Sequence, residues 1–210
     1  MNDKRIDIDR FDPRLAKTYG RERDKQQHYD DWAHSYEADL VDDLDYVAYR
    51  EASEIFTANV EDRRLRILDV ACGTGLVGEY LRARGYDQVE GADFSREMLA
   101  RAEQRRIYEA LWQHDFTAPK PLETPYDALI CVGLFAFGVP GICDLHHVVN
   151  CVAPGGLCVI TVNGAAWRQL RLEPEVYRAA ELHGFRIEQV IEAEYIRKQD
   201  IDARVLLVRR

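Results

Sequence analysis

The chain has 210 residues, of which 47% are hydrophobic and 31% charged, and this is the size and composition of one globular domain with its own core. Its 37 acidic and 28 basic residues give a formal net charge of −9, which argues against a surface built to neutralise the phosphates of a nucleic acid. No apolar run approaches the ~20 residues that a membrane-spanning helix needs.

The amino terminus and the cysteines bear on the cellular compartment. The first residues are charged and lead into further charged residues, so we expect no secretory signal. The cysteines form no Cys-x-x-Cys pair, and we expect reduced thiols at Cys72, Cys131, Cys143, Cys151 and Cys158. These features predict a cytoplasmic protein without a metal site.

The amino-terminal part differs in pattern from the rest. Residues 1–27 are highly charged and predict a loose arm or a solvated helix. An apolar stripe then predicts a helix over 29–40, formed by Tyr29, Trp32, Ala33, Tyr36 and Leu40. A second helix is predicted over 45–60, with Asp45 as its N-cap and Asn59 on its inner edge. We expect residues 1–60 to form this arm and two lid helices, and residues 61–210 to form the main part of one structural domain.

Strands and helices alternate through the remainder of the chain. Strands are predicted at 66–70, 88–92, just before 114, 128–132 and 157–162, with helices at 75–84, from Ser95, at 142–152 and at 174–183. The last two strands, 185–191 and 204–208, are joined by a polar turn, which predicts an antiparallel pair. We therefore expect an α/β fold, Rossmann-like and doubly wound, whose mostly parallel seven-stranded sheet ends in that antiparallel pair and carries the lid helices at its amino terminus.

Acids and glycines follow the first strands at the positions where open parallel sheets bind ligands. The first strand is followed by Asp69-Val70-Ala71-Cys72-Gly73-Thr74-Gly75, whose glycines permit a sharp turn into a helix N-terminus. Asp93 ends the second strand, where a carboxylate can accept hydrogen bonds from both hydroxyls of a ribose. Asp115 and Phe116 follow the third strand and suit an exocyclic amine and the flat face of a base.

Two nucleoside cofactors fit these residues. Gly73, Gly75 and Gly78 form Gly-x-Gly-x-x-Gly with an acid 18 residues after Gly75, so a nicotinamide dinucleotide has to be considered. Against it, Asp69 would repel a pyrophosphate but attract the ammonium group of a methionine moiety. The chain also leaves no second domain for a hydride-transfer substrate.

At these residues the sequence resembles the class I S-adenosylmethionine-dependent methyltransferases, from about Tyr29 to the end. The shared motifs are Asp69-x-x-x-Gly73-x-Gly75, Asp93, Asp115, Tyr126-Asp127-Ala128-Leu129-Ile130 and the Pro154-Gly155-Gly156 turn before the fifth strand. Within this class it looks most like the methyltransferase-like proteins of the Williams–Beuren deletion region, through Tyr29-Asp30-x-Trp32-Ala33-x-x-Tyr36, the 69–77 segment, Arg105-Arg106-Ile107-Tyr108 and Val139-Pro140.

The resemblance implies S-adenosylmethionine as cofactor, S-adenosylhomocysteine as product, and residues 61–210 as the cofactor-binding domain. The cofactor-binding residues that it implies are Tyr29, Tyr36, Asp69, Ala71, Cys72, Gly73, Gly75, Asp93, Phe94, Met98, Asp115, Phe116 and Val132. Ala71 departs from the class pattern, which has glycine there, and we expect it to be tolerated with a negative φ.

The function that we expect is in-line methyl transfer to a small-molecule acceptor by a monomer or homodimer, with no nucleic-acid or membrane partner. No catalytic residue is assigned. A catalytically silent module that binds S-adenosylmethionine and a nicotinamide-dependent oxidoreductase remain as alternatives. On the acceptor side, several side chains stay open between a role in the site and a structural one: Trp32, Tyr46, Tyr49, Phe135, Phe137, His114, His146, His147, Asn163, Trp167 and Tyr195.

Overall fold

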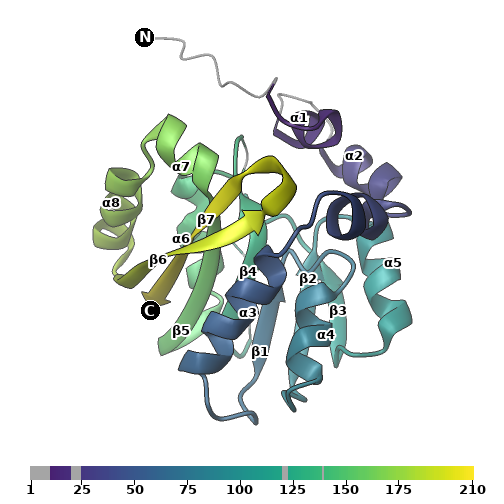
Figure 1. The fold of residues 1–210 in the computed structure, drawn as a ribbon. Coiled ribbons are helices and arrows are strands. Elements are labelled where there is room, and N and C mark those ends of the chain that lie inside the picture. Colours follow the sequence, from purple (N-terminus) through teal and green to yellow (C-terminus); the bar gives the residue numbers. More distant parts are fainter. Residues whose placement is uncertain (1–9, 20–24, 120–122, 139) are drawn as a thin grey trace.

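The computed structural model describes residues 10–19, 25–119, 123–138 and 140–210. A seven-stranded sheet runs through the molecule in the order β3-β2-β1-β4-β5-β7-β6 (Figure 1). The strands are β1 (Ile67–Val70), β2 (Val89–Asp93), β3 (Ala110–Gln113), β4 (Tyr126–Phe135), β5 (Val152–Asn163), β6 (Arg186–Ile196) and β7 (Ile201–Arg209). The first five are parallel, and β7 lies antiparallel between β5 and β6. This confirms the expected α/β sheet with its antiparallel pair.

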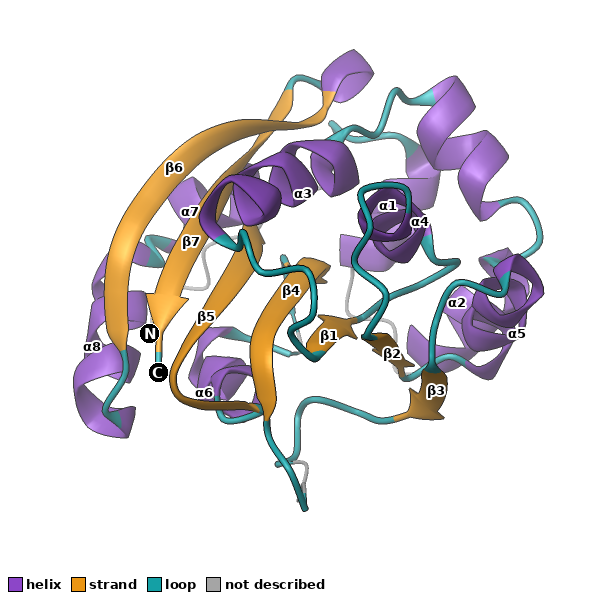
Figure 2. Cartoon of the chain, turned by 90° about the horizontal axis from the view of Figure 1, so that it is seen from below, coloured by secondary structure: helices purple, strands orange, loops and turns teal. Residues whose placement is uncertain are grey.

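Helices cover both faces of this sheet, with α3 on one face and α6 and α8 on the other (Figure 2). The helices of the main part are α3 (Ala48–Asn59), α4 (Leu76–Arg82), α5 (Arg96–Arg105), α6 (Leu145–Val149), α7 (Gly164–Leu170) and α8 (Glu173–His183). Two of the predicted helix ends are confirmed. The Ser95 side chain accepts a hydrogen bond from the Met98 amide at the start of α5, and Gly184 ends α8 in the left-handed conformation.

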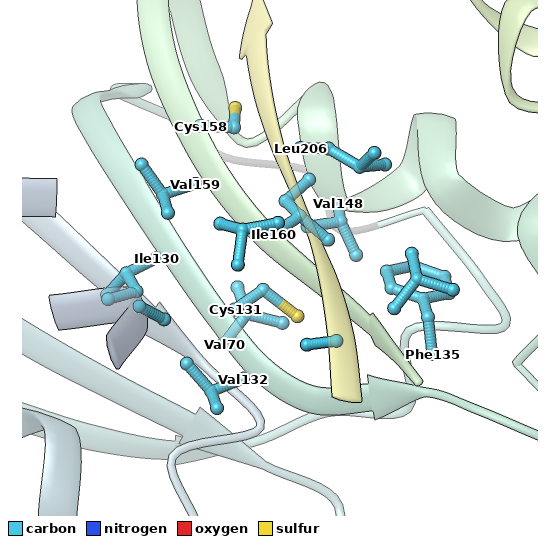
Figure 3. Packing of buried hydrophobic residues seen from close by; sticks show 14 of the residues in the cluster. Val70, Ile130, Cys131, Val132, Phe135, Val148, Cys158, Val159, Ile160 and Leu206 are labelled. Carbon is cyan, nitrogen blue, oxygen red and sulfur yellow. The ribbon is translucent and has the colours of Figure 1, made fainter. Parts of the chain in front are cut away.

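The core lies where the central strands pack between these helices. All four residues of β1 are buried, as expected for a parallel strand that is covered on both faces. Side chains of β4 and β5 fill the adjoining space, among them Ile130, Cys131, Cys158 and Ile160 (Figure 3). The sheet is therefore a rigid support for the loops at its carboxyl edge.

The prediction of one continuous helix over 29–40 is wrong, because the structure breaks it into separate pieces. The structure has α1 (Pro13–Tyr19), α2 (Lys25–Trp32), a turn at 33–35 and a π-helix over Ala38–Asp43. Trp32 Nε1 and Ser35 Oγ both donate to the carboxylate of Asp39, at 2.7 and 2.8 Å. Such side-chain bonds compete with the regular helix ladder, which accounts for the break. Within the predicted arm, residues 1–9 and 20–24 lie outside the described residues.

The start of the second helix also differs from the prediction. Asp45 does not cap α3 but takes a φ of +56°, and the helix begins at Ala48. The preceding residues are drawn toward β6, because Tyr46 forms an antiparallel bridge with Ile196 and the Val47 amide donates to the Tyr195 carbonyl. Asn59, predicted on the inner edge of this helix, is exposed.

Other element boundaries shift by a few residues. The helix predicted over 142–152 is a 3-10 turn at Ile142–Asp144 followed by the short α6, and Val152 already belongs to β5. The Pro154–Gly156 segment lies inside β5, where its pairing with β4 shifts register, rather than before it. The polar turn at 199–200 is confirmed, although β6 extends to Ile196.

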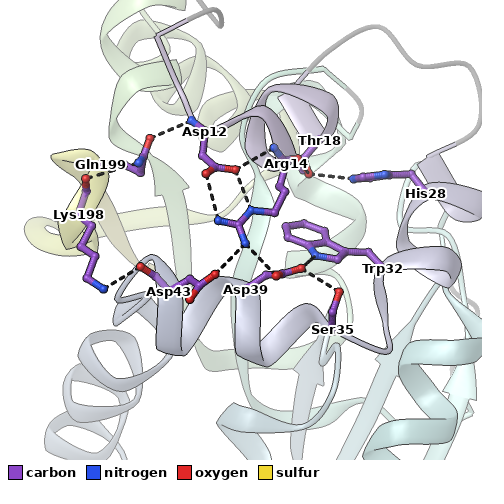
Figure 4. Close-up of polar contacts among 10 residues, drawn as sticks. All are labelled: Asp12, Arg14, Thr18, His28, Trp32, Ser35, Asp39, Asp43, Lys198 and Gln199. Carbon is purple, nitrogen blue, oxygen red and sulfur yellow. Dashed lines mark hydrogen bonds and ion pairs between the residues drawn. The ribbon is translucent and has the colours of Figure 1, made fainter.

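The lid, which we define as residues 10–19 and 25–43, is bound to the main part by several polar contacts. Arg14 is hydrogen-bonded to Asp12, Asp39 and Asp43, while Gln199 and Lys198 from the β6–β7 connection bond the main chain of Asp12 and Asp43 (Figure 4). On its other side the lid meets α5 and its N-cap residue: Asp30 bonds Ser95 and the Glu97 amide, His34 bonds Arg101, and Glu37 pairs with Arg105. Among the described residues no helix is long and apolar enough to cross a membrane.

Candidate functional site

A cavity of about 600 Å³ lies beyond the carboxyl ends of β1, β2 and β4, between these strand ends and the lid. This is the volume range of pockets that hold cofactors and small molecules. Its walls combine the loop after β1, the end of β2, the loop after β4 and three lid tyrosines, Tyr19, Tyr29 and Tyr36. The cavity is therefore where the strand-end argument predicts a ligand.

Asp93 is the carboxylate that the structure presents to this cavity at the end of β2. Its Oδ2 accepts a hydrogen bond from the Gly73 amide and its Oδ1 one from the Ser95 amide, both at 2.9 Å. Each oxygen retains a further lone pair for a ligand hydroxyl. Burial raises the pKa of Asp93 to about 6, against the opposing effect of these amide bonds. Asp93 thus both fixes the loop after β1 and offers two acceptor atoms to a ligand.

Asp69, in contrast, is not brought to the cavity wall. It is buried beneath the loop, where Tyr108 Oη donates to its Oδ2 at 2.7 Å. Its Oδ1 has no hydrogen-bond partner among the described residues. Burial raises the pKa of Asp69 to about 7, so that near neutrality this carboxyl group is only partly ionised. Asp69, for which the sequence suggested contact with a ligand ammonium group, therefore does not line the cavity.

The loop after β1 is bent by three residues with positive φ. Gly73 and Gly75 have φ values of +53° and +99°, and Ala71 has +56°. The expectation of a negative φ at Ala71 is therefore wrong. The Cys72 amide donates to the Ala92 carbonyl, and the Gly73 amide to Asp93, so the loop is drawn toward β2 and Ala71 must turn the chain. A left-handed non-glycine residue costs about 1–2 kcal/mol, which the neighbouring bonds must offset.

Ten of the thirteen predicted cofactor residues line the cavity together: Tyr29, Tyr36, Ala71, Gly73, Asp93, Phe94, Met98, Asp115, Phe116 and Val132. Cys72 lines a smaller hollow that shares Tyr36, Ala71 and Gly73 with the cavity. Gly75 lines neither, because it faces the side chain of Arg105. The structure thus brings most of these residues together around one cavity and turns Asp69, Cys72 and Gly75 away from it.

Asp115 and Phe116 also line the cavity. The Asp115 carboxylate accepts from the Thr117 amide at 2.9 Å, which fixes its orientation. His114 stands edge-on to the Phe116 ring, with ring centroids 4.8 Å apart, and lines the cavity as well. These side chains offer a carboxylate and an aromatic face to a ligand.

A further part of the cavity lining is aromatic. It is formed by Tyr19, Tyr29, Trp32, Tyr36, Tyr46, Phe137 and Tyr195. Burial raises the pKa of all five tyrosines, so their hydroxyls stay protonated at neutral pH. The structure therefore places hydrogen-bond donors and rings in this part of the lining, but no phenolate base.

Sequence reasoning missed part of this aromatic lining. Tyr19 lies in a stretch that reads as a charged arm, yet it is buried, and Asn163 Nδ2 donates to its hydroxyl at 3.1 Å. The apolar spacing of Phe11, Leu15 and Tyr19 was the available signal. Of the open alternatives, Tyr46 and Tyr195 line the cavity, whereas Tyr49 lines only the smaller hollow.

The other acceptor-side candidates divide in the same way. Phe137 lines the cavity, whereas Phe135 is buried in β4 away from it. His146 stacks on His183 at 3.8 Å between α6 and α8, and neither it nor His147 lines the cavity. Trp167 does not line it either. Among the described residues there is no group of three or more His, Cys, Asp or Glu side chains that could hold a metal ion.

Comparison with known proteins agrees with this geometry. Residues 67–156 match the family model described as a methyltransferase domain. The human methyltransferase-like protein 27 is 38% identical over 143 residues, which are 65% of this chain and 57% of that protein. These comparisons support a methyltransferase.

Solved structures agree at the level of the fold. A TehB-like SAM-dependent methyltransferase from Corynebacterium glutamicum has a TM-score of 0.60 at 20% identity, over 86% of this chain and 97% of that one. Magnesium protoporphyrin IX methyltransferase from Synechocystis with bound SAM has a TM-score of 0.58 at 17% identity, over 100% and 98%. With the domain match, they support S-adenosylmethionine as the cofactor.

Proposed function

We propose that the protein is an S-adenosylmethionine-dependent methyltransferase that acts on a small-molecule acceptor by in-line transfer. The observation that carries this proposal is one cavity whose lining combines Asp93, held by two backbone amides, with several aromatic side chains. The lid closes over this cavity, which favours an acceptor that enters whole over a macromolecular chain. The net charge of −9 agrees with the absence of a nucleic-acid partner.

In this proposal each wall has a separate task. Asp93 accepts the ribose hydroxyls, and Asp115 and Phe116 hold the adenine. The methionine end lies along Ala71 and Gly73, since Asp69 is withdrawn beneath the loop. When bound, the cofactor supplies an electrophilic methyl group on a sulfonium, which becomes a thioether as the methyl leaves.

The protein then contributes chiefly by alignment. Holding the acceptor in line with the methyl group can remove up to about 7–11 kcal/mol of the barrier. The tyrosine hydroxyls are protonated and orient the acceptor by hydrogen bonding, and the lid excludes water. Proton removal is not needed for an acceptor that already carries a free lone pair. His114 and Asp115 also line the cavity.

Binding and turnover test the two parts of the proposal separately. Isothermal titration with S-adenosylmethionine and S-adenosylhomocysteine should show saturable binding of both, and absence of binding at millimolar concentration would refute the cofactor site. Turnover should then be measured with methyl-labelled cofactor and a pool of small metabolites, against a matched pool of RNA and protein. Label transferred to the macromolecules alone would refute the small-molecule acceptor.

A catalytically silent cofactor-binding module is the second candidate. It is favoured by the protonated tyrosines, which leave the aromatic lining without a base. Binding without turnover by any acceptor would support it. The dinucleotide alternative loses support from the sheet, because classic dinucleotide folds have the order 3-2-1-4-5-6 rather than an inserted antiparallel β7.

Two finer expectations extend the proposal. The motifs at 29–36, 69–77 and 105–108 support a closer relation to the Williams–Beuren-region methyltransferase-like proteins. The five free thiols support a reducing compartment such as the cytoplasm. Fractionation of cells that express the tagged chain tests the second expectation.

A further inference from the structure

The segment Arg105-Arg106-Ile107-Tyr108 lies at the C-terminal end of α5. The proposed function assigns no binding role to these residues. Arg106 takes a φ of +55° and turns the chain out of the helix. This turn leaves Arg105 on the last helical turn and sends Tyr108 under the loop after β1. The two long side chains therefore reach the same loop from one short segment.

Arg105 makes three polar contacts with its planar guanidinium. Its Nε donates to the Thr74 carbonyl oxygen at 2.7 Å, within the loop after β1. Its two terminal nitrogens pair with the carboxylates of Glu37 in the lid and Glu79 in α4. The Arg105 side chain is 21% exposed, whereas Glu79 is 59% exposed. The partly buried contacts to Thr74 and Glu37 therefore carry more of the interaction than the one to Glu79.

Both of these partners are next to residues that line the cavity. Thr74 follows Gly73, whose amide bonds Asp93, and Glu37 follows Tyr36 of the aromatic lining. One guanidinium thus joins the cofactor wall and the lid wall. The lid also contacts this region through Asp30 and His34, but their partners, Ser95, Glu97 and Arg101, are not residues of the loop after β1.

Tyr108 supports the same loop from below. Its ring lies so close to Gly78 and Gly91 that an added Cβ would come within 2.4 Å at Gly78 and 3.1 Å at Gly91. Its hydroxyl holds Asp69. The loop is therefore supported by Tyr108 and held laterally by Arg105.

We infer that Arg105 is a positioning residue that couples closure of the lid to the conformation of the cofactor loop. This role rests on the proposed cofactor site. A cofactor that orders the loop also fixes the Thr74 carbonyl, which orients Arg105 to receive Glu37 and so brings Tyr36 over the cavity. In reverse, the bound lid slows departure of the cofactor.

A double-mutant cycle on S-adenosylhomocysteine binding tests this coupling. The dissociation constant and dissociation rate are measured for the unaltered protein, Arg105→Ala, Glu37→Ala and the double variant. Arg105→Ala should weaken binding about tenfold or more, the effect of a lost charge-assisted hydrogen bond. Glu37→Ala should weaken it about threefold, through a faster dissociation rate. Glu37→Ala should have no further effect when Arg105 is already absent.

The controls separate coupling from a merely structural role. Arg105→Lys keeps the positive charge but loses the planar guanidinium with its several donors. This variant should bind more tightly than Arg105→Ala and less tightly than the unaltered protein. Arg82→Ala removes another paired arginine, which contacts Asp87 and Glu109 outside the cavity, and should bind as the unaltered protein does. Additive effects of the two substitutions, or unchanged binding by Arg105→Ala with a lowered melting temperature, would overturn the inference.

Two further outcomes are decisive. If Arg105→Ala does not fold, Glu37→Ala and Glu37→Gln report on the lid alone, and an unchanged dissociation rate in both overturns the coupling. If the unaltered protein binds no S-adenosylhomocysteine, the proposed function itself fails. Binding by the unaltered protein with no change in any variant defeats only the role of Arg105.

Discussion

Two buried carboxyl groups, Asp69 and Asp93, both lie at the loop after β1 but differ in their surroundings. Asp93 is exposed to the cavity between two amide donors, and Asp69 is enclosed with Tyr108. Burial raises both pKa values, to about 6 and about 7. A raised pKa means that folding is opposed by ionisation, so both groups make the protein less stable as the pH rises.

Replacement of Asp93 by alanine should weaken cofactor binding by at least about 1–3 kcal/mol, since a ribose hydroxyl and the Gly73 amide both lose their acceptor. Titration calorimetry with S-adenosylhomocysteine measures this. Asp127→Ala is the matched control, because Asp127 bonds the Arg66 amide at the start of β1, at the opposite edge of the sheet. An unchanged dissociation constant in Asp93→Ala would remove the ribose role.

Asp69→Asn should make stability less dependent on pH. The folded pKa of about 7 lies above the ordinary aspartate value of 3.8, so the folded state retains its proton to higher pH than the unfolded chain. The unaltered protein therefore loses stability as the pH rises from about 4 to about 7. The Asp69→Asn variant lacks this loss, because its amide does not ionise. Between pH 5 and pH 7 the difference should reach about 2–3 kcal/mol, measured by urea unfolding at both pH values. Parallel pH profiles of the two proteins would contradict it.

The strand-end acids and glycines could be predicted at this scale because their sequence positions follow directly from the fold. The withdrawal of Asp69 could not, because it depends on Tyr108, which lies 39 residues away and enters from another element. The φ of Ala71 was equally hidden, since it results from hydrogen bonds to Ala92 and Asp93 across the neighbouring strand.

At the scale of elements, the loop after β1 is strained at Ala71. Ala71→Gly should raise the free energy of unfolding by about 0.5–1 kcal/mol, because relief of the left-handed strain exceeds the added entropy of the unfolded chain. Ala83→Gly is the matched control at a φ of −62° and should lower it by a similar amount. Chemical denaturation measures both. Destabilisation by both glycines would mean that Ala71 is not strained.

The local stability of the lid should depend on Arg14, which lies within the lid. Arg14→Ala removes the group that links Asp12, Asp39 and Asp43. Hydrogen exchange over residues 13–19 and 25–43 should become faster, while global stability changes by less than about 1 kcal/mol because these groups are partly solvated. Arg64→Ala, which removes a similar pair with Asp62 in an exposed loop, should leave lid exchange unchanged. Equal exchange in both variants would contradict this role.

The lid is also the element that sequence predicts least well. Its apolar stripe was read correctly, since Tyr29, Trp32 and Tyr36 all face the cavity. The break at 33–35 was not predicted, because it depends on hydrogen bonds from Trp32 and Ser35 to Asp39. The spacing of apolar residues carries no information about such bonds. The alternating strands and helices were predictable, since buried apolar runs determine them.

For the whole molecule, ligand binding should appear as added stability. S-adenosylhomocysteine at a hundred times its dissociation constant contributes about 2.7 kcal/mol, which raises the melting temperature of a chain of this size by about 5–10 °C. Reduced nicotinamide dinucleotide at the same concentration should leave it unchanged. Differential scanning fluorimetry compares the two, and a shift with the dinucleotide alone would reverse the assignment.

The insertion of β7 between β5 and β6 has a consequence for how the chain is completed during synthesis. β6 leaves the ribosome before β7, its neighbour in the sheet, and so cannot dock where it belongs. Tyr195, carried at the end of β6, reaches the cavity only after β7 has been added. A nascent chain that has emerged as far as residue 196 therefore has the ends of β1, β2 and β4 but cannot yet hold Tyr195 in place, so the lining of the cavity is completed in two stages.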